Sequence, residues 1–262
     1  MTAAMGRQVV VTGAASGIGA SVSRLLRGRG DEVIGVDLHD VEVVADLSAP
    51  EGRRAAVAAV LRRTDGVVDA VVACAGTAAP TEAAITVNYF GVVDLLDALR
   101  PALARADRPR AAVISSIAST QPTDAGVLAA CAERDEKRAV ALAGKVSADG
   151  RGYQLYGSSK LALARWVRRT SITPGWAGAG IPLNAVAPGV VVTPMTESLL
   201  ATEGGRELVD RAVPMPLNGY APPEAVAHAL IWLAGPENTH VTGQVVFIDG
   251  GADATLRGED CF

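Results

Sequence analysis

A tyrosine and a lysine four residues apart are the side chains of this sequence best suited to acid–base chemistry. They are the ends of the run Tyr156-Gly157-Ser158-Ser159-Lys160. On a helix this spacing places both side chains on one face. A nearby ammonium lowers the pKa of a phenol from about 10, so that the phenol can exchange a proton with a substrate. The alternative is an ordinary surface pair on an amphipathic helix, because the pattern is common by chance.

A glycine-rich turn near the N-terminus has the composition of a phosphate-binding loop. Three valines and a threonine at residues 9–12 lead into Gly13, Ser16, Gly17, Ile18 and Gly19, and a helical pattern follows. Glycines allow backbone N–H groups to approach a pyrophosphate, and the start of a helix adds partial positive charge. The turn alone also fits a tight strand-to-helix connection without a ligand.

An acidic residue about 20 positions after this turn favours a dinucleotide. Asp37 ends the apolar run 32–37, where a carboxylate can accept hydrogen bonds from the adenosine ribose. The same carboxylate would repel a 2′-phosphate, and the glycine turn carries no basic side chain. We therefore predict NAD rather than NADP as the cofactor. Taken alone, Asp37 could equally be an ordinary turn residue at the end of a strand.

Composition excludes several other classes of protein. The 262 residues carry a formal net charge of −4, which argues against nucleic acid or an anionic membrane surface as a partner. No apolar run is long enough to span a membrane, and residues 1–8 lack the apolar stretch of a signal peptide. The cysteines and histidines lack metal-ligand spacing, so we expect no metal site. A cytoplasmic location is the expectation.

The elements that must position these residues alternate along the chain. Apolar runs predict strands at 8–12, 32–37, 42–45, 67–74, 111–116, 183–187 and 244–248. Helical periodicity predicts helices at 17–29, 50–63, 86–105, 153–170 and 223–233. Strands alternating with helices indicate βαβ units in a doubly wound parallel sheet. No linker or repeat interrupts the pattern, so residues 1–262 are predicted to form a single α/β domain.

Two segments depart from this alternation. Residues 123–152 carry a charged, amphipathic pattern and predict an insertion of one or two helices before Tyr156. Residues 188–216 are rich in proline and glycine and indicate a loop. Within that loop, residues 190–216 are the candidate substrate lid, and their apolar side chains suit a hydrophobic ring system. Met195 and Leu199 are the candidate substrate contacts in this lid.

Several short motifs occur along the chain in one order. They are Thr12-Gly13, Gly17-Ile18-Gly19, Asp46-Leu47, Cys74-Ala75-Gly76, Asn88, Ser115-Ser116, Tyr156-x-x-x-Lys160 and Pro188-Gly189. In this order they resemble the short-chain dehydrogenase/reductase family over nearly the whole chain. The resemblance implies a Rossmann-like domain with a seven-stranded parallel sheet. It also implies hydride transfer between a nicotinamide and an alcohol or carbonyl carbon.

The resemblance assigns catalytic roles to four residues. Tyr156 would be the general acid in reduction and the base in oxidation. Lys160 would lower the pKa of this tyrosine and bind the nicotinamide ribose. Ser116 would position and polarise the substrate oxygen. Asn88 resembles the asparagine that supports a water-linked proton path, although it could also be a residue at a helix start or kink.

The resemblance also assigns a dinucleotide-binding wall beyond the glycine turn and Asp37. Its members are Asp46, Leu47, Cys74, Ala75, Gly76, Pro188, Gly189, Val191 and Thr193, together with Tyr156 and Lys160. Asp46 would meet the adenine, and Thr193 would contact the carboxamide. Cys74 departs from the pattern, because the family usually has asparagine there. We interpret Cys74 as a small buried apolar residue rather than a nucleophile.

The inserted segment points to a particular group within the family. Ser116 and Tyr156 lie 40 residues apart, which is much further than in most relatives. The chain is similar in this respect to bacterial hydroxysteroid dehydrogenase/carbonyl reductase members of the family. This resemblance implies a small hydrophobic alcohol or ketone as substrate, with NAD(H)-dependent interconversion of a steroid 3α-alcohol and a 3-ketone as the favoured reaction. Other alicyclic or aryl carbonyl substrates remain alternatives. A dinucleotide-binding regulator without activity is a third interpretation, although such relatives usually lack the tyrosine or lysine.

The insertion also bears on assembly. In the family the helix that carries the tyrosine often packs against a partner subunit. An added amphipathic segment at residues 123–152 should cover this surface. We therefore predict a homodimer rather than the common tetramer.

Overall fold

Apolar runs along the sequence pair into one seven-stranded parallel sheet in the computed structural model, which describes residues 6–261. The strands are β1 (Gln8–Thr12), β2 (Glu32–Asp37), β3 (Val43–Val44), β4 (Ala70–Ala73), β5 (Arg110–Ile114), β6 (Leu183–Pro188) and β7 (Val245–Ile248). Their order in the sheet is β3-β2-β1-β4-β5-β6-β7. The order reverses between β1 and β4, and the crevice at the carboxyl ends of such strands is where ligands bind in this architecture.

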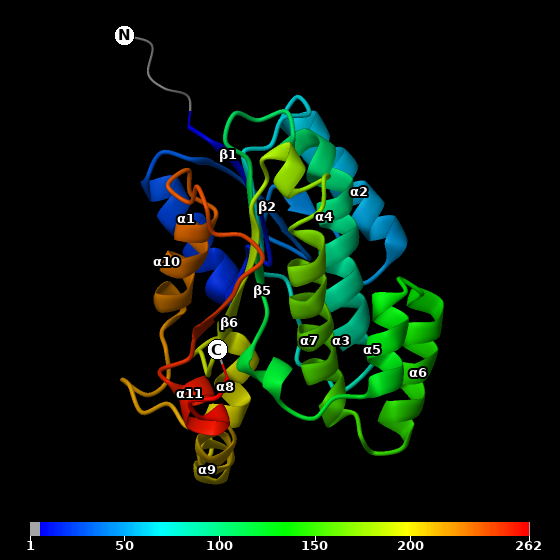
Figure 1. Cartoon of the computed structure of the whole chain (residues 1–262), viewed down its shortest axis with the longest axis vertical. Coiled ribbons are helices and arrows are strands. Elements are labelled where there is room, and N and C mark those ends of the chain that lie inside the picture. Colours follow the sequence, from blue (N-terminus) through cyan, green and yellow to red (C-terminus); the bar gives the residue numbers. More distant parts are fainter. Residues whose placement is uncertain (1–5, 262) are drawn as a thin grey trace.

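Helices cover both faces of the sheet, so most strand residues are buried (Figure 1). Val9 and Val11 of β1 pack with α1 (Gly17–Gly28) and α10 (Pro223–Leu233) on one face. Val10, between them, packs with the other face, where α2 (Pro50–Arg63), α4 (Gly91–Leu103) and α7 (Tyr153–Thr170) lie. This alternation along one strand explains why the run is continuously apolar. The predicted doubly wound α/β fold is confirmed, and residues 1–5 and 262 of the predicted domain lie outside the described residues.

The predicted helix at 86–105 differs from the structure in its start and its geometry. Helical backbone begins with α3 (Ala83–Ile85), continues through the π-helical turn η1 (Thr86–Phe90) and ends with α4 at Leu103. In η1 the N–H of Gly91 donates to the carbonyl of Thr86, five residues earlier. Such a turn contains one extra residue and is frequent at functional sites. Here it contains Asn88.

Two helices occupy the inserted segment. They are α5 (Ala125–Ala132) and α6 (Glu136–Ala148), and Figure 1 shows them outside α7 and α4. Asp124 and Asp135 begin them as N-caps, because each carboxylate accepts a hydrogen bond from a backbone N–H three residues later. Val127, Cys131 and Val146 are buried against the core shared with α7.

The prediction of a loop at residues 188–216 was wrong over much of its length. The segment contains α8 (Pro194–Leu200) and α9 (Glu203–Ala212). Thr193 and Thr196 form a capping box at the start of α8, and Thr202 caps α9 by accepting from the N–H of Gly205. These caps, together with Pro194 at the first helical position, are start signals that the prediction missed.

Three further short elements complete the chain. They are η2 (Ile117–Thr120), η3 (Ala177–Ala179) and α11 (Ala252–Arg257). Figure 1 places α8, α9 and α11 together at the end of the sheet where the strands finish. Within residues 6–261, no helix is both long enough and apolar enough to cross a membrane.

Candidate active site

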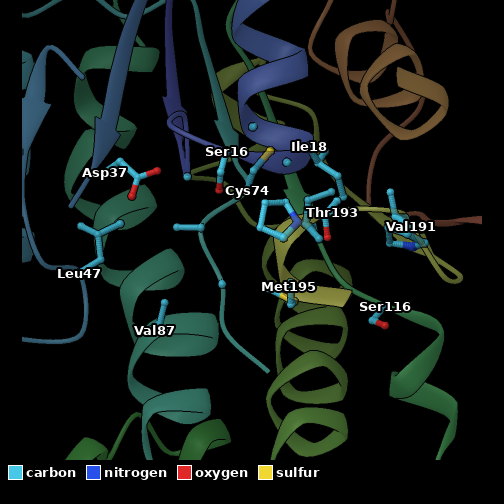
Figure 2. A pocket seen from close by; sticks show the side chains of 18 of the residues that line it. Ser16, Ile18, Asp37, Leu47, Cys74, Val87, Ser116, Val191, Thr193 and Met195 are labelled. Atoms are coloured by element: carbon cyan, nitrogen blue, oxygen red, sulfur yellow. The ribbon is translucent and has the colours of Figure 1, made fainter. Parts of the chain in front are cut away.

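A cavity of about 260 Å³ opens at the carboxyl ends of the central strands. It is lined by Gly13, Ser16, Gly17, Ile18, Gly19, Val36, Asp37, Leu38, Ala45, Asp46, Leu47, Cys74, Ala75, Gly76, Val87, Ile114, Ser115, Ser116, Tyr156, Lys160, Pro188, Gly189, Val191, Thr193, Pro194, Met195 and Thr196. Every residue proposed from the sequence as a dinucleotide contact is in this lining. Figure 2 shows Asp37 and Leu47 at one end of the cavity and Ser116 at the other.

The glycine turn leaves space and backbone donors at the start of α1. Gly13 and Gly17 have φ values of 67° and 52°, a region that glycine adopts without strain. A Cβ on Gly19 would lie 2.0 Å from the carbonyl oxygen of Gly13, so that position has room only for glycine. The first N–H groups of a helix lack partners within the helix. Because those of α1 face this cavity, the turn fits a pyrophosphate.

Asp37 is held in place at the end of β2 by two backbone donors. Its Oδ2 accepts from the N–H of Ala15 in the glycine turn at 2.9 Å, and its Oδ1 accepts from the N–H of Leu38 at 2.7 Å. Among the described residues that line the cavity, Lys160 is the sole cation. The end that contains Asp37 therefore presents negative charge, which disfavours an additional phosphate there.

The rest of the cavity wall includes Asp46, Cys74 and Gly76. Asp46 accepts a hydrogen bond from the N–H of Ser48 at 2.8 Å, and hydrogen bonding from Ser48 lowers the pKa of this carboxyl. A Cβ on Gly76 would lie 3.2 Å from Oδ1 of Asn88, so a side chain there would crowd the wall. Burial raises the pKa of the Cys74 thiol to about 12. The Cys74 side chain is half-buried in the cavity wall rather than fully buried as predicted, and its raised pKa disfavours a thiolate there.

Tyr156 and Lys160 lie on one face of α7, as the spacing predicts. Lys160 is only 3% exposed, and its Nζ donates to the carbonyl of Ile114 at 2.9 Å. The same Nζ lies 5.7 Å from the centroid of the Tyr156 ring. Ser116 begins η2 as its N-cap, lines the same cavity as Tyr156 and lies close enough to it to lower the pKa of its phenol. A hydroxyl, a phenol and an ammonium therefore meet at the end of β5.

Burial controls the protonation of this cluster. Burial lowers the pKa of Lys160 to about 8. Burial also raises the pKa of Tyr156, and the Ser116 hydroxyl opposes this rise. The shift of Tyr156 is opposite in sign to the one predicted from its spacing to Lys160. The physical reason is that the cost of removing a phenolate from water outweighs the opposing effect of the Ser116 hydroxyl on the pKa.

Two predicted site residues do not line the cavity. Asn88 is fully buried behind Gly76, where its amide accepts from the N–H of Thr77 at 2.8 Å and donates to Oγ of Ser159 at 3.0 Å. It therefore contacts the cavity wall rather than the cavity. Leu199 lies further along α8 than Met195 and is 42% exposed. The helical turn of α8, which the loop prediction did not include, brings Met195 into the lining and leaves Leu199 outside it.

Sequence reasoning also missed some of the lining. Val36, Leu38, Ala45, Val87, Ile114, Ser115, Pro194 and Thr196 line the cavity without having been predicted. Most are neighbours of predicted residues at the ends of strands. Thr196 carried a usable signal, because it stands three residues after Thr193 in a capping box. Thr193 itself packs against the glycine turn, since a Cβ on Gly17 would lie 3.3 Å from its Cγ2.

Comparison with known proteins agrees with this geometry. A family model described as Enoyl-(Acyl carrier protein) reductase matches residues 13–253. The chain belongs to the short-chain dehydrogenase/reductase family. It is therefore an oxidoreductase of a family that binds nicotinamide dinucleotides, and the Rossmann-like architecture expected from its motifs is confirmed.

Three relatives of this short-chain dehydrogenase/reductase are particularly similar. The 3-alpha-hydroxysteroid dehydrogenase/carbonyl reductase of Comamonas testosteroni is 37% identical over 254 residues, covering 95% of this chain and 97% of that protein. The cis-4-hydroxycyclohexanecarboxylate dehydrogenase of Sinomonas cyclohexanicum is 32% identical over 269 residues, with coverages of 95% and 97%. The crystal structure of the 3-alpha-hydroxysteroid dehydrogenase from Pseudomonas sp. B-0831 complexed with NADH has a TM-score of 0.90 and 42% identity, covering 97% of this chain and 100% of that one.

Proposed function

We propose that the protein is an NAD(H)-dependent enzyme that interconverts a secondary alcohol and a ketone on a hydrophobic cyclic substrate, with a 3α-hydroxysteroid/3-ketosteroid pair favoured. The observation that carries this proposal is that Ser116, Tyr156 and Lys160 line the same cavity as Asp37, with Ser116 and Asp37 at its opposite ends (Figure 2). The names of the relatives from Comamonas testosteroni and Pseudomonas support the steroid substrate.

The residues that line the cavity fit a nicotinamide dinucleotide. The turn from Gly13 to Gly19 would hold the pyrophosphate, and Asp37 would hold the adenosine ribose. When bound, the dinucleotide supplies the hydride in reduction and accepts it in oxidation. Asp37 is the reason for proposing NAD, because its carboxylate stands where a 2′-phosphate would need a cation.

The proton chemistry would depend on Tyr156. In reduction its phenol would donate a proton to the substrate oxygen, and a high pKa keeps that proton in place until then. Ser116, which lines the cavity together with Tyr156, would hold the same oxygen. Lys160 would return a proton to Tyr156, since a pKa of about 8 allows it to release one near neutral pH. Asn88 would support the path to solvent through the loop at Thr77.

The proposed substrate class follows from the apolar surface beside the cavity. Val192, Met195, Leu199, Leu208 and Leu217 are exposed on or next to α8 and α9. Met195 lines the cavity, and exposed apolar side chains in the segment that contains it favour a large hydrophobic substrate. A smaller alicyclic alcohol is the second candidate, supported by the name of the relative from Sinomonas cyclohexanicum.

A substrate panel tests the proposal. We expect NADH to form from NAD when steroid 3α-alcohols are added, with kcat/KM above that for alicyclic alcohols. Tyr156→Phe should lower kcat by about 100-fold or more while NADH binding is retained. Absence of NADH formation with every steroid and alicyclic alcohol would refute the proposed reaction.

A homodimer is the assembly we propose. The insertion helices α5 and α6 pack against α7, the helix that carries Tyr156 and Lys160. With this face covered by the chain itself, one of the surfaces through which relatives form tetramers would be lost.

A further inference from the structure

A buried arginine connects the cavity to the inserted helices. Arg53 lies in the first turn of α2 and is 3% exposed. Its Nε donates to the carbonyl of Leu47 at 2.9 Å, and its Nη2 donates to the carbonyl of Ser48 at 2.9 Å. Leu47 lines the cavity. Arg53 therefore holds the backbone of one wall segment from behind.

The same guanidinium reaches a second segment of the wall. Its Nη2 lies within hydrogen-bond distance of the carbonyl of Thr86 at 3.4 Å, and its Cζ lies 6.0 Å from the ring centroid of Phe90. These two residues begin and end η1, and Val87 between them lines the cavity. Figure 2 shows Leu47 and Val87 on the side of the cavity that also holds Asp37. One side chain thus contacts two segments of the wall at that end, the loop at Leu47 and Ser48 and the turn η1.

The insertion contributes a carboxylate to this arginine. Glu136, the first residue of α6, accepts from Nη1 of Arg53 at 2.9 Å with one oxygen and from Nη2 at 2.5 Å with the other. Asp94 of α4 accepts from Nη1 at 2.7 Å. The side chain of Glu136 is 25% exposed, so this pair is largely shielded from water. A two-pronged contact of this kind fixes the plane of a guanidinium as well as its charge.

We propose that Glu136 and Arg53 are positioning residues through which the inserted helices set the affinity for the adenine half of the dinucleotide. Without the Glu136 carboxylate, the buried charge of Arg53 would keep Asp94 as its one acidic partner. The guanidinium would then turn toward Asp94, and its hydrogen bonds to the carbonyls of Leu47, Ser48 and Thr86 would weaken. The inference rests on the proposed function, which places the adenosine beside Asp37 and Leu47.

The test compares two glutamates of the insertion. Glu136→Gln removes the carboxylate from Arg53. Glu133→Gln is the matched control, because it removes the same charge from the insertion. Glu133 pairs with Arg138, and both of these side chains are exposed. Dissociation constants for NADH are measured by fluorescence titration, and those for adenosine 5′-monophosphate by competition. For Glu136→Gln we expect both constants to rise roughly 3- to 30-fold, with a larger effect on KM for NAD than on kcat. For the control we expect the wild-type values.

A second variant keeps the inference testable if the first is poorly folded. Arg53→Lys keeps the charge but loses the planar set of donors, so it should weaken adenosine 5′-monophosphate binding at least as much. Adding Glu136→Gln to it should cause no further loss, because both act through the same contacts. Unchanged binding in Glu136→Gln, or additive losses in the double variant, would overturn the inference alone. Failure of the wild-type protein to bind NADH would overturn the proposed function.

Discussion

Replacing Lys160 with methionine should change how the stability of the protein depends on pH. Lys160 is 3% exposed, and burial lowers its pKa from 10.5 to about 8. Between these two values the unfolded chain binds a proton that the folded chain does not. Stability that depends on Lys160 therefore rises as the pH rises through this window.

The size of the effect follows from the same two values. The gap between 10.5 and about 8 corresponds to about 3 kcal/mol, of which about 2–3 kcal/mol is reached by pH 10. Groups far from Lys160 that titrate in this range are present in both proteins, and their contributions cancel when wild type and Lys160→Met are compared.

The assay is urea unfolding at pH 7 and pH 10 without added dinucleotide. We expect the free energy of unfolding of the wild type, relative to Lys160→Met, to increase by about 2–3 kcal/mol between these pH values. Lys145→Met is the control, because it removes a lysine that is exposed on α6. Parallel pH dependence in wild type and Lys160→Met would refute the view that the Lys160 ammonium is desolvated.

Three further predictions test the cavity and the assembly. Asp37→Ala should raise the ratio of kcat/KM for NADP to that for NAD at least about fivefold, since a charge pair a few ångströms apart is worth about 1 kcal/mol even in water; an unchanged ratio would argue against the role of Asp37. Gly19→Ala should weaken NADH binding about 100-fold, because its Cβ would lie 2.0 Å from the carbonyl oxygen of Gly13. Gly28→Ala in the same helix meets no atom within 4 Å, so its NADH titration should match that of the wild type. Light scattering should give the mass of a dimer, and a clean tetramer would contradict the proposed covering of α7 by α5 and α6.

Local signals were enough to predict most of the fold. The bounds of β1, β2, α2, α7 and α10 match those predicted from the sequence. These elements are long or bounded by glycine, proline or acidic residues, so their periodicity dominates. The short helices α8 and α9 were missed, because their capping residues Thr193 and Thr202 resemble turn residues in a segment rich in proline and glycine. The π-helical turn was missed, and its Asn88 contacts Thr77 and Ser159, which lie 11 and 71 residues away in the sequence.

The candidate site, like the fold, could be predicted from the sequence only in part. Its residues come from strand ends and turns, which sequence motifs reveal, and the facing of Tyr156 and Lys160 follows from helical spacing. Leu199 lies outside the cavity lining, because the direction of a side chain on α8 depends on a helix that was not predicted, and its contact with substrate stays a prediction. The Arg53 contacts gave no sequence signal, since its carboxylate partners lie 41 and 83 residues away.

The sequence by itself determined the order of strands and helices, the glycine turn and the identity of the reacting side chains. These properties depend on residue type and on spacing within one element. Only the tertiary structure decided the direction of the pKa shift of Tyr156, the pKa of Lys160 and the contact of the insertion with Arg53. Each of these depends on how far a side chain is buried, and segments that are distant in the sequence bury it by packing together.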